Sequence, residues 1–199
     1  MENRHASSSG TETDWDATEH RILDAAAQLI RTRGVNAVTI ADIARGAEVS
    51  RPTIYRRWPG ADEITRAVLL RAALRILEQF DALATTRAAI VDDVLRFSEL
   101  FRADELYGAL LESHPEVFTR YTLHRIGASQ RAILRWLSDA IAQAQRNGSV
   151  RAGAPDQIAV MLLLIAQSAI LSHNTVASLI DEANWRTELW HALDGHLRP

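Results

Sequence analysis

The stretch Thr39 to Trp58, TIADIARGAEVSRPTIYRRW, decides how the first part of this chain folds. Thr39 and Ser50 carry side-chain oxygens of the kind that cap helix N-termini. Pro52 falls in the first turn of the helix after Ser50, where its missing N–H costs little. Residues 47–49 leave room only for a sharp turn between the two segments. The stretch therefore predicts two short helices joined by a tight turn.

The apolar side chains of this stretch can form one small shared core, made of Ile40, Ile43, Ala44, Ala47, Val49, Ile54 and Trp58. At about 100° per residue, with Ile54 facing that core, Pro52 and Arg56 point away from it and Thr53 and Tyr55 flank them. A surface helix of an ordinary helical protein would explain any single arginine here. The combination favours a helix-turn-helix that lies in the major groove of DNA, because the stretch has two helix caps, a short turn, a shared apolar core and a basic outward face.

Each outward residue type has a use on DNA. Arginine can donate two hydrogen bonds to guanine, and an apolar group can meet a thymine methyl. Hydroxyls and the N-terminus of the second helix suit phosphate oxygens, which fix register without reading sequence. The predicted DNA-binding residues are Thr39, Arg45, Ser50, Arg51, Pro52, Thr53, Tyr55 and Arg56.

Residues 18–64 resemble the N-terminal domain of tetracycline-repressor-type (TetR family) transcriptional regulators. The matching residues are Gly34, Thr39, Ile43-Ala44, Val49-Ser50, Thr53-Ile54-Tyr55, Trp58 and Asp62-Glu63. The chain departs from the family at Glu48 and Pro52, which stand where glycine is usual or frequent, and at Ala61, where a phosphate-binding lysine is common. Glu48 puts a carboxylate near the DNA side, for which Arg45 is the candidate partner. The resemblance implies a homodimer on operator DNA whose second helical domain varies widely within the family.

Composition sets the wider limits. The 199 residues are 47% hydrophobic and 24% charged, which is typical of a globular protein, and without cysteine the chain has no disulfide and no thiolate metal site. The formal net charge is −3, and all 22 basic residues are arginine. Residues 17–60 nevertheless hold seven arginines against four acidic residues. A basic end on an acidic body is typical of DNA binding confined to one end.

Membrane and export signals are weak. Residues 1–15 are polar, predict a disordered arm and lack the apolar run of a signal peptide. The longest apolar stretch, residues 158–171, is too short to span a bilayer and predicts a buried helix. We therefore expect a cytoplasmic protein without a membrane partner.

Periodicity and turn signals predict an all-α chain of about nine helices. The expected helices span 16–34, two segments that start after Thr39 and Ser50, then 62–80, 86–101, 105–113, 116–146 with a kink near Gly127, 155–172 and 181–197. The expected domains are a helix-turn-helix domain over 16–61 and a ligand-binding and dimerisation domain over 62–199.

The last two helices are candidates for a dimer interface. The helix over 155–172 is apolar nearly all round, so every side of it must be covered. The resemblance implies that both helices pair with their symmetry mates in a four-helix interface. The predicted interface residues are Ile165, Ala169, Trp185, Leu189 and Leu193. The alternative is that these stripes pack inside one chain.

A sensing cavity in the second domain is more plausible than an active site. The sequence holds no HExxH, GxGxxG, P-loop or EF-hand pattern, its seven histidines do not cluster, and we expect neither metal nor cofactor. A mainly apolar pocket with a few polar groups suits a hydrophobic small molecule. The candidate lining residues are Phe97, Phe101, Tyr107, Phe118, Tyr121, His124, Trp136, Met161 and Gln167. The alternative is that they only fill the core.

The function predicted from sequence is a repressor that a small hydrophobic ligand releases from a pseudo-palindromic operator. Two other hypotheses remain: a DNA-binding regulator without an effector, and a helical small-molecule binding protein that does not touch DNA.

Overall fold

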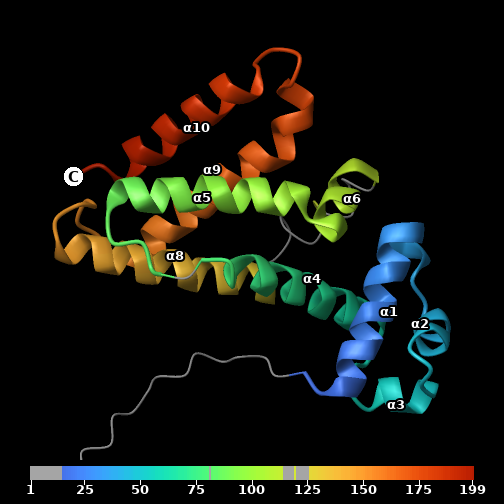
Figure 1. The fold of residues 1–199 in the computed structure, drawn as a ribbon. Helices are drawn as coiled ribbons and strands as arrows, with labels where there is room; N and C mark the ends of the chain where they lie inside the picture. Colours follow the sequence, from blue (N-terminus) through green and yellow to red (C-terminus); the bar gives the residue numbers. More distant parts are fainter. Residues whose placement is uncertain (1–14, 81, 114–118, 120–125) are drawn as a thin grey trace, which may run out of the picture.

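The computed structural model describes residues 15–80, 82–113, 119 and 126–199. Within this part of the chain there are nine α-helices, one short 3-10 helix and no strand, which confirms the all-α prediction (Figure 1). The elements are α1 (Ala17–Arg33), η1 (Val35–Ala37), α2 (Ile40–Gly46), α3 (Arg51–Tyr55), α4 (Ala61–Leu77), α5 (Arg87–Ala103), α6 (Glu105–Ser113), α8 (Ala128–Arg146), α9 (Pro155–Val176) and α10 (Glu182–Leu197).

Helix α1 begins with a capping box. The Asp16 carboxylate accepts from the Glu19 N–H at 2.8 Å, and the Glu19 carboxylate accepts from the Asp16 N–H at 2.9 Å. The helix ends at Gly34, whose φ of 75° favours glycine. Trp15 was expected to belong to the polar arm, but its indole packs against the core beside His20, with ring centroids 6.3 Å apart. The rest of the predicted arm, residues 1–14, lies outside the described residues.

Helix α4 connects the small N-terminal bundle to the rest of the chain (Figure 1). Its buried face carries Ile64, Val68 and Ala72, and it contacts α1, α5, α6 and α8. An ion pair of 2.7 Å between Arg71 of α4 and Asp24 of α1 adds to this contact. The helix ends at Leu77, one turn earlier than predicted. α4 therefore reaches from the short N-terminal helices into the core of the second bundle.

Helix α8 starts later than the sequence suggests. A single kinked helix was predicted from residue 116, but Ile126 and Gly127 are not helical and Gly127 is extended, with φ −84° and ψ −179°. α8 begins at Ala128 and packs against α4 and α9. The predicted segments 114–118 and 120–125 lie outside the described residues. The extended backbone at Gly127 therefore marks the start of α8, within the range that the apolar pattern predicted as one helix.

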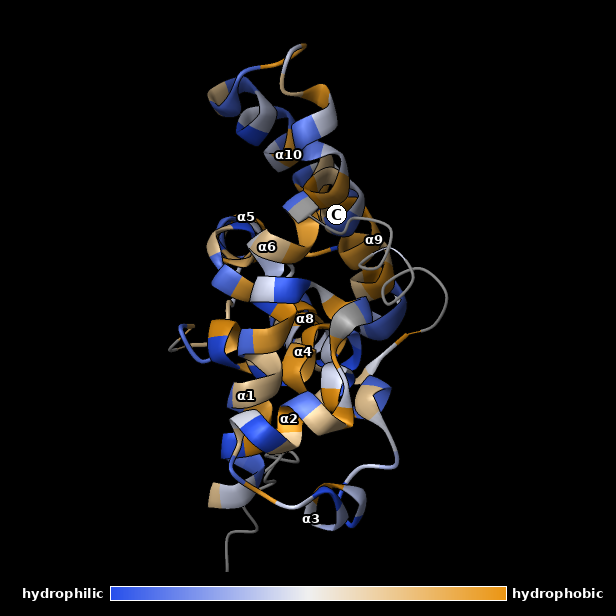
Figure 2. Ribbon diagram, turned by 90° about the vertical axis from the view of Figure 1, so that its right-hand side faces the viewer, coloured by the Kyte–Doolittle hydropathy of each residue, from blue (hydrophilic) through white to orange (hydrophobic). Residues whose placement is uncertain are grey.

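Helix α9 is the most apolar element, as the hydropathy colouring shows (Figure 2). It is longer than predicted: at 22 residues it has the length and composition to cross a membrane, so the argument that this segment is too short was wrong. Its buried side chains, Ile158 and Leu162 among them, instead pack in the bundle against α8, α5 and α10. Val160, Met161 and Leu164 remain 42–45% exposed.

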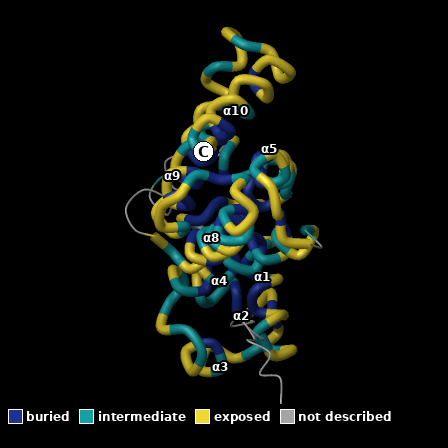
Figure 3. The backbone as a smooth tube through the Cα atoms, turned by 90° about the vertical axis from the view of Figure 1, so that its left-hand side faces the viewer, coloured by how far each residue is buried: buried dark blue, intermediate teal, exposed yellow. Residues whose placement is uncertain are grey.

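Helix α10 packs its apolar stripe inside the protomer, against α5 and α9. Trp185, Leu189 and Leu193 have exposed fractions of 9%, 7% and 0%. Figure 3 shows the buried residues of α10 among exposed ones. Burial within one chain leaves these three side chains little surface for a partner, which favours the alternative that the stripe packs inside one chain. Ile165 and Ala169 of α9 are half-buried. The sequence pattern predicts the apolar stripe of α10, but it does not specify which helix covers that stripe.

A buried carboxylate fixes the end of α10. Asp194 is 2% exposed, accepts from Arg87 Nε at 2.5 Å and from Arg198 Nη2 at 2.8 Å. The hydrogen bond from Arg198 is the main reason why the pKa of Asp194 lies below its ordinary value of 3.8, and Arg87 lowers it further. The pair from Arg87 ties the start of α5 to the last turn of α10.

Candidate nucleic-acid interface and internal cavity

The two helices of the predicted helix-turn-helix are capped as the sequence indicates. The Asp42 N–H donates to the Thr39 hydroxyl at 3.1 Å at the start of α2, and the Thr53 N–H donates to the Ser50 hydroxyl at 3.3 Å at the start of α3. Ile54 is fully buried against the small core. Since both caps bond to neighbouring residues, the local sequence is sufficient to place both helix starts.

The outward face of α3 matches the predicted facing. Arg51, Pro52 and Arg56 are exposed, Tyr55 is 56% exposed and Thr53 is half-buried. Thr39, Arg45 and Ser50 are exposed on the same end of the molecule. All eight predicted DNA-binding residues thus lie on the α2–α3 end. Their contact with DNA stays a prediction.

Arg57 turns away from this face. Its Nη2 lies 2.8 Å from the Asp16 carboxylate and its Nε lies 3.8 Å from the Glu19 carboxylate, both at the start of α1. The hydrogen bond from Arg57 is the main reason why the pKa of Asp16 lies below its ordinary value. Arg57 therefore braces α3 against α1. Helical periodicity could not find this pair, because 41 residues separate its members.

The turn before α3 contains an uncommon backbone conformation. Glu48 has a φ of 53°, the only positive φ of a non-glycine residue in the described part of the chain. Side chains other than glycine rarely adopt this left-handed conformation, because Cβ crowds the following carbonyl oxygen. Glycine at this position would adopt the conformation without that steric cost. Arg45 was the candidate partner of Glu48, but its guanidinium pairs with Asp42 at 2.9 Å instead.

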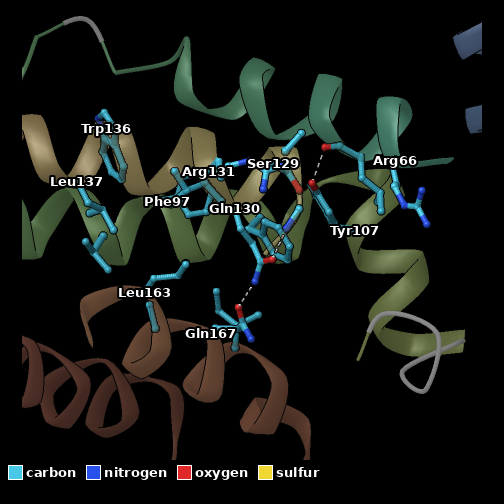
Figure 4. Close-up of a pocket in the computed structure, with 18 of the residues that line it drawn as sticks. Arg66, Phe97, Tyr107, Ser129, Gln130, Arg131, Trp136, Leu137, Leu163 and Gln167 are labelled. Atoms are coloured by element: carbon cyan, nitrogen blue, oxygen red, sulfur yellow. Dashed lines mark hydrogen bonds between the residues drawn. The ribbon is translucent and has the colours of Figure 1, made fainter. Parts of the chain in front are cut away.

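A cavity of about 520 Å³ lies in the second bundle between α4, α5, α8 and α9 (Figure 4). Of the predicted pocket residues, Phe97, Phe101, Tyr107, Trp136 and Gln167 line it. Met161 does not: it is 45% exposed on the outer face of α9, because its position lies on the opposite side of that helix from the buried residues. Phe118, Tyr121 and His124 lie outside the described residues.

Aromatic rings make much of the cavity wall. The Phe97 ring centroid is 5.8 Å from that of Trp136 and 6.0 Å from that of Phe101. The Phe101 and Tyr107 rings are stacked, 3.9 Å apart. The Tyr107 hydroxyl donates to the Leu69 carbonyl of α4 at 2.6 Å, and burial raises the pKa of Tyr107, so the hydroxyl keeps its proton. Tyr107 therefore joins the cavity wall to α4.

Two buried glutamine side chains complete the cavity. Gln130 Nε2 of α8 donates to Gln167 Oε1 of α9 at 3.0 Å (Figure 4). Sequence reasoning missed Gln130, although it lies on the same helical face as the buried Ile133 and Leu137, at spacings of three and seven residues. Its position in line with the apolar stripe of α8 is the sequence feature from which the burial of Gln130 could have been predicted.

Among the described residues that line the cavity, three carry a formal charge. Asp62 and Arg66 of α4 and Arg131 of α8 are all exposed. Arg66 pairs with Glu63 at 2.8 Å, and Arg131 donates to the Ile126 carbonyl at 2.9 Å. Among the residues that the structure describes, no group of three histidine, aspartate or glutamate side chains could hold a metal ion. The buried part of the lining that the structure describes therefore consists of apolar side chains and neutral polar groups.

The sequence profile of the bacterial regulatory proteins of the tetR family matches residues 22–68. The chain is 41% identical over 180 residues to the HTH-type transcriptional regulator Rv2250c of Mycobacterium tuberculosis, which covers 90% of this chain and 94% of that relative. The chain belongs to the TetR family of transcriptional regulators. A second M. tuberculosis relative, the HTH-type regulator Rv1556, is 24% identical over 182 residues and covers 84% of this chain and 86% of its own length.

Solved structures of TetR-type fold agree with the whole architecture. The fatty acid degradation regulator FadR from Bacillus halodurans superposes with a TM-score of 0.62 at 16% identity, over 93% of this chain and 98% of its own. RolR in complex with resorcinol gives a TM-score of 0.64 at 16% identity, over 91% and 87%. At this identity the likeness shows the fold of this TetR-family regulator, with its helix-turn-helix at one end and its cavity in the second bundle.

Proposed function

We propose that this TetR-family regulator is a cytoplasmic repressor, which binds a pseudo-palindromic operator as a homodimer and is released by a small, mainly apolar ligand. The observation that carries the proposal is the position of the cavity. Leu69 and Arg66 of α4 line it, and the same helix begins at Ala61, directly after the helix-turn-helix. A ligand that changes how α4 lies would change the position of α3. We propose the domain division 16–61 and 62–199 on the same ground.

On the operator, α3 enters the major groove with Pro52 and Arg56 toward the bases. Arg56 then selects guanine, and Arg45 meets a phosphate. One five-residue helix spans few base pairs, so specificity needs two copies of α3 about 34–36 Å apart on two half-sites. Any ligand-bound state with a different spacing binds the operator more weakly.

The dimer surface that we propose is the outer face of α9. Val160, Met161 and Leu164 are exposed there, and Ile165 and Ala169 flank them half-buried. Exposed apolar residues that follow one helix face favour a partner surface. A second copy of α9 offers the same face, and α10 beside it extends the contact, as in an isologous two-fold interface.

The energetic demand on the ligand is modest. A tenfold loss of operator affinity requires a differential binding free energy of about 1.4 kcal/mol between the two conformations, and a near-complete switch requires about 5.5 kcal/mol. A cavity of about 520 Å³ accommodates a ligand large enough to supply this through burial of apolar surface.

Selection of bound sites from random duplex DNA tests the DNA half of the proposal. The wild-type protein should enrich a two-fold symmetric site. Arg56→Ala should lose about 1–3 kcal/mol and relax base preference at one position of each half-site, whereas Arg45→Ala should weaken all sequences alike and reduce the salt dependence. Uniform loss in both variants would show that the facing assignment is wrong, and a monomer without an enriched site would overturn the proposed function.

A further inference from the structure

The buried amides of the cavity form a chain of hydrogen bonds with a defined direction. The Gly127 backbone N–H donates to Gln130 Oε1 at 3.1 Å, and Gln130 Nε2 donates to Gln167 Oε1 at 3.0 Å. A backbone N–H can only donate, so the first bond assigns oxygen and nitrogen in Gln130, and the second assigns them in Gln167. Gln167 is 9% exposed and lines the cavity, and its Nε2 has no protein acceptor in the described part of the chain. The chain therefore ends in a donor at the cavity (Figure 4).

The other buried polar groups of the wall already bond to one another. The Tyr107 hydroxyl gives its proton to the Leu69 carbonyl and bonds to the Ser129 side chain. Because the Tyr107 proton is used, Ser129 is the donor of that second bond. Neither hydroxyl needs a ligand. Gln167 Nε2, which has no acceptor among the described residues, can gain a hydrogen bond from a ligand.

The charge distribution restricts the ligand further. Among the described lining residues, the charged ones are Asp62, Arg66 and Arg131, which are exposed and of both signs. A carboxylate or ammonium group placed deep in the cavity would find no buried opposite charge among the described lining residues. Burying an unpaired charge costs much more free energy than burying a neutral acceptor. The aromatic rings of Phe97 and Trp136 offer stacking and edge contacts to another ring.

We propose that the cavity binds an uncharged aromatic molecule that places one oxygen acceptor, a carbonyl or an ether, against Gln167 Nε2. This inference rests on the proposed function, in which the cavity holds the effector. Gln130 is the positioning residue: it does not need to touch the ligand, but it holds the Gln167 amide with its nitrogen toward the cavity.

Three probes of similar shape and different polarity test the ligand class. Benzophenone carries two rings and a carbonyl, diphenylmethane replaces that carbonyl by CH₂, and diphenylacetate adds a carboxylate. Dissociation constants are measured by calorimetry on the full-length protein without DNA. Benzophenone should bind about tenfold more tightly than diphenylmethane, as expected for one buried hydrogen bond, and diphenylacetate should bind most weakly.

Substitutions assign the preference to one side chain. In Gln167→Met, which keeps the length of the side chain and removes the donor, the two neutral probes should bind equally, with diphenylmethane affinity within about twofold of wild type. Gln157→Met, the same change at an exposed position of α9, is the matched control and should keep the tenfold preference. Gln130→Met should reduce the preference in the same direction, which provides a second test if Gln167→Met does not fold.

The opposite results are equally clear. Equal binding of both neutral probes by the wild type, a preference that survives in Gln167→Met, tightest binding of diphenylacetate, or no binding of any probe would overturn the ligand class. An operator gel shift with and without benzophenone tests the proposed effector role separately from the ligand class. Selective binding of benzophenone without any effect on operator affinity would contradict the effector role while supporting the ligand class.

Discussion

Replacing Glu48 by glycine should stabilise the protein. Glu48 has a φ of 53°, a conformation that costs an L-residue about 1–2 kcal/mol and glycine nothing. Glycine in turn lowers the free energy of unfolding by about 0.4–1 kcal/mol, because it gives the unfolded chain more conformational freedom. The net gain is about 0.5–1 kcal/mol, which raises Tm by about 1–4 °C in a chain of this size. Thermal unfolding followed by circular dichroism measures it.

The control for this change is Glu48→Ala, which removes the carboxylate but keeps Cβ and therefore the strain. We expect no comparable rise in Tm for the alanine variant. Both variants should bind the operator more tightly than wild type and to the same extent, because each removes a negative charge beside α3. A rise in Tm as large in Glu48→Ala as in Glu48→Gly would refute the backbone argument. A lower Tm in Glu48→Gly would refute it too.

Three further substitutions test contacts between distant parts of the chain. Arg57→Ala removes the brace to Asp16 and should lower operator affinity in a gel shift without changing base preference. Tyr107→Phe removes a buried hydrogen bond to α4 and should lower Tm by about 2–4 °C, from a loss of about 1 kcal/mol. Asp194→Asn should cost about 1–3 kcal/mol at pH 7 by urea unfolding. Since hydrogen bonding from Arg198 lowers the pKa of Asp194, this contribution is complete above the ordinary value of 3.8 and disappears as the pH falls through the lowered pKa.

Each of these expectations has a contrary result. A shifted base preference in Arg57→Ala would place that side chain on the DNA. An unchanged Tm in Tyr107→Phe would mean that water replaces the hydroxyl at no cost. A free-energy difference between Asp194→Asn and wild type that stays constant from pH 7 to about pH 2 would show that the carboxylate acts through its shape and not through its charge.

The helix-turn-helix could be predicted almost residue by residue, because its signals are local. Thr39 and Ser50 each bond to the backbone N–H three residues further along. With Ile54 buried, helical periodicity alone sets which residues of α3 face outward. For the left-handed turn, the sequence indicated only that Glu48 stands where the resemblance leads one to expect glycine. A glutamate in place of glycine does not itself reveal the φ that the turn requires.

The second bundle was less predictable, because its contacts join residues far apart in sequence. The stripe of α10 was found, but Trp185 and Leu193 face their own protomer, and an amphipathic pattern does not specify its partner. Gln130 and Gln167 are 37 residues apart, and nothing local pairs them. Met161 was placed in the cavity because α9 is apolar on all sides, so its hydrophobic pattern could not distinguish inner from outer faces.

Helix α6 has a consequence for engineered hybrids. Glu105 pairs with Arg31 of α1, and Tyr107 of the same helix bonds to the α4 carbonyl at Leu69. A chimera that exchanges helix-turn-helix domains between family members at Gly60 would keep the second bond and replace the first with whatever the donor domain carries at position 31. Grafting a new DNA specificity onto this sensor therefore requires that α1 and α6 be exchanged together or rematched.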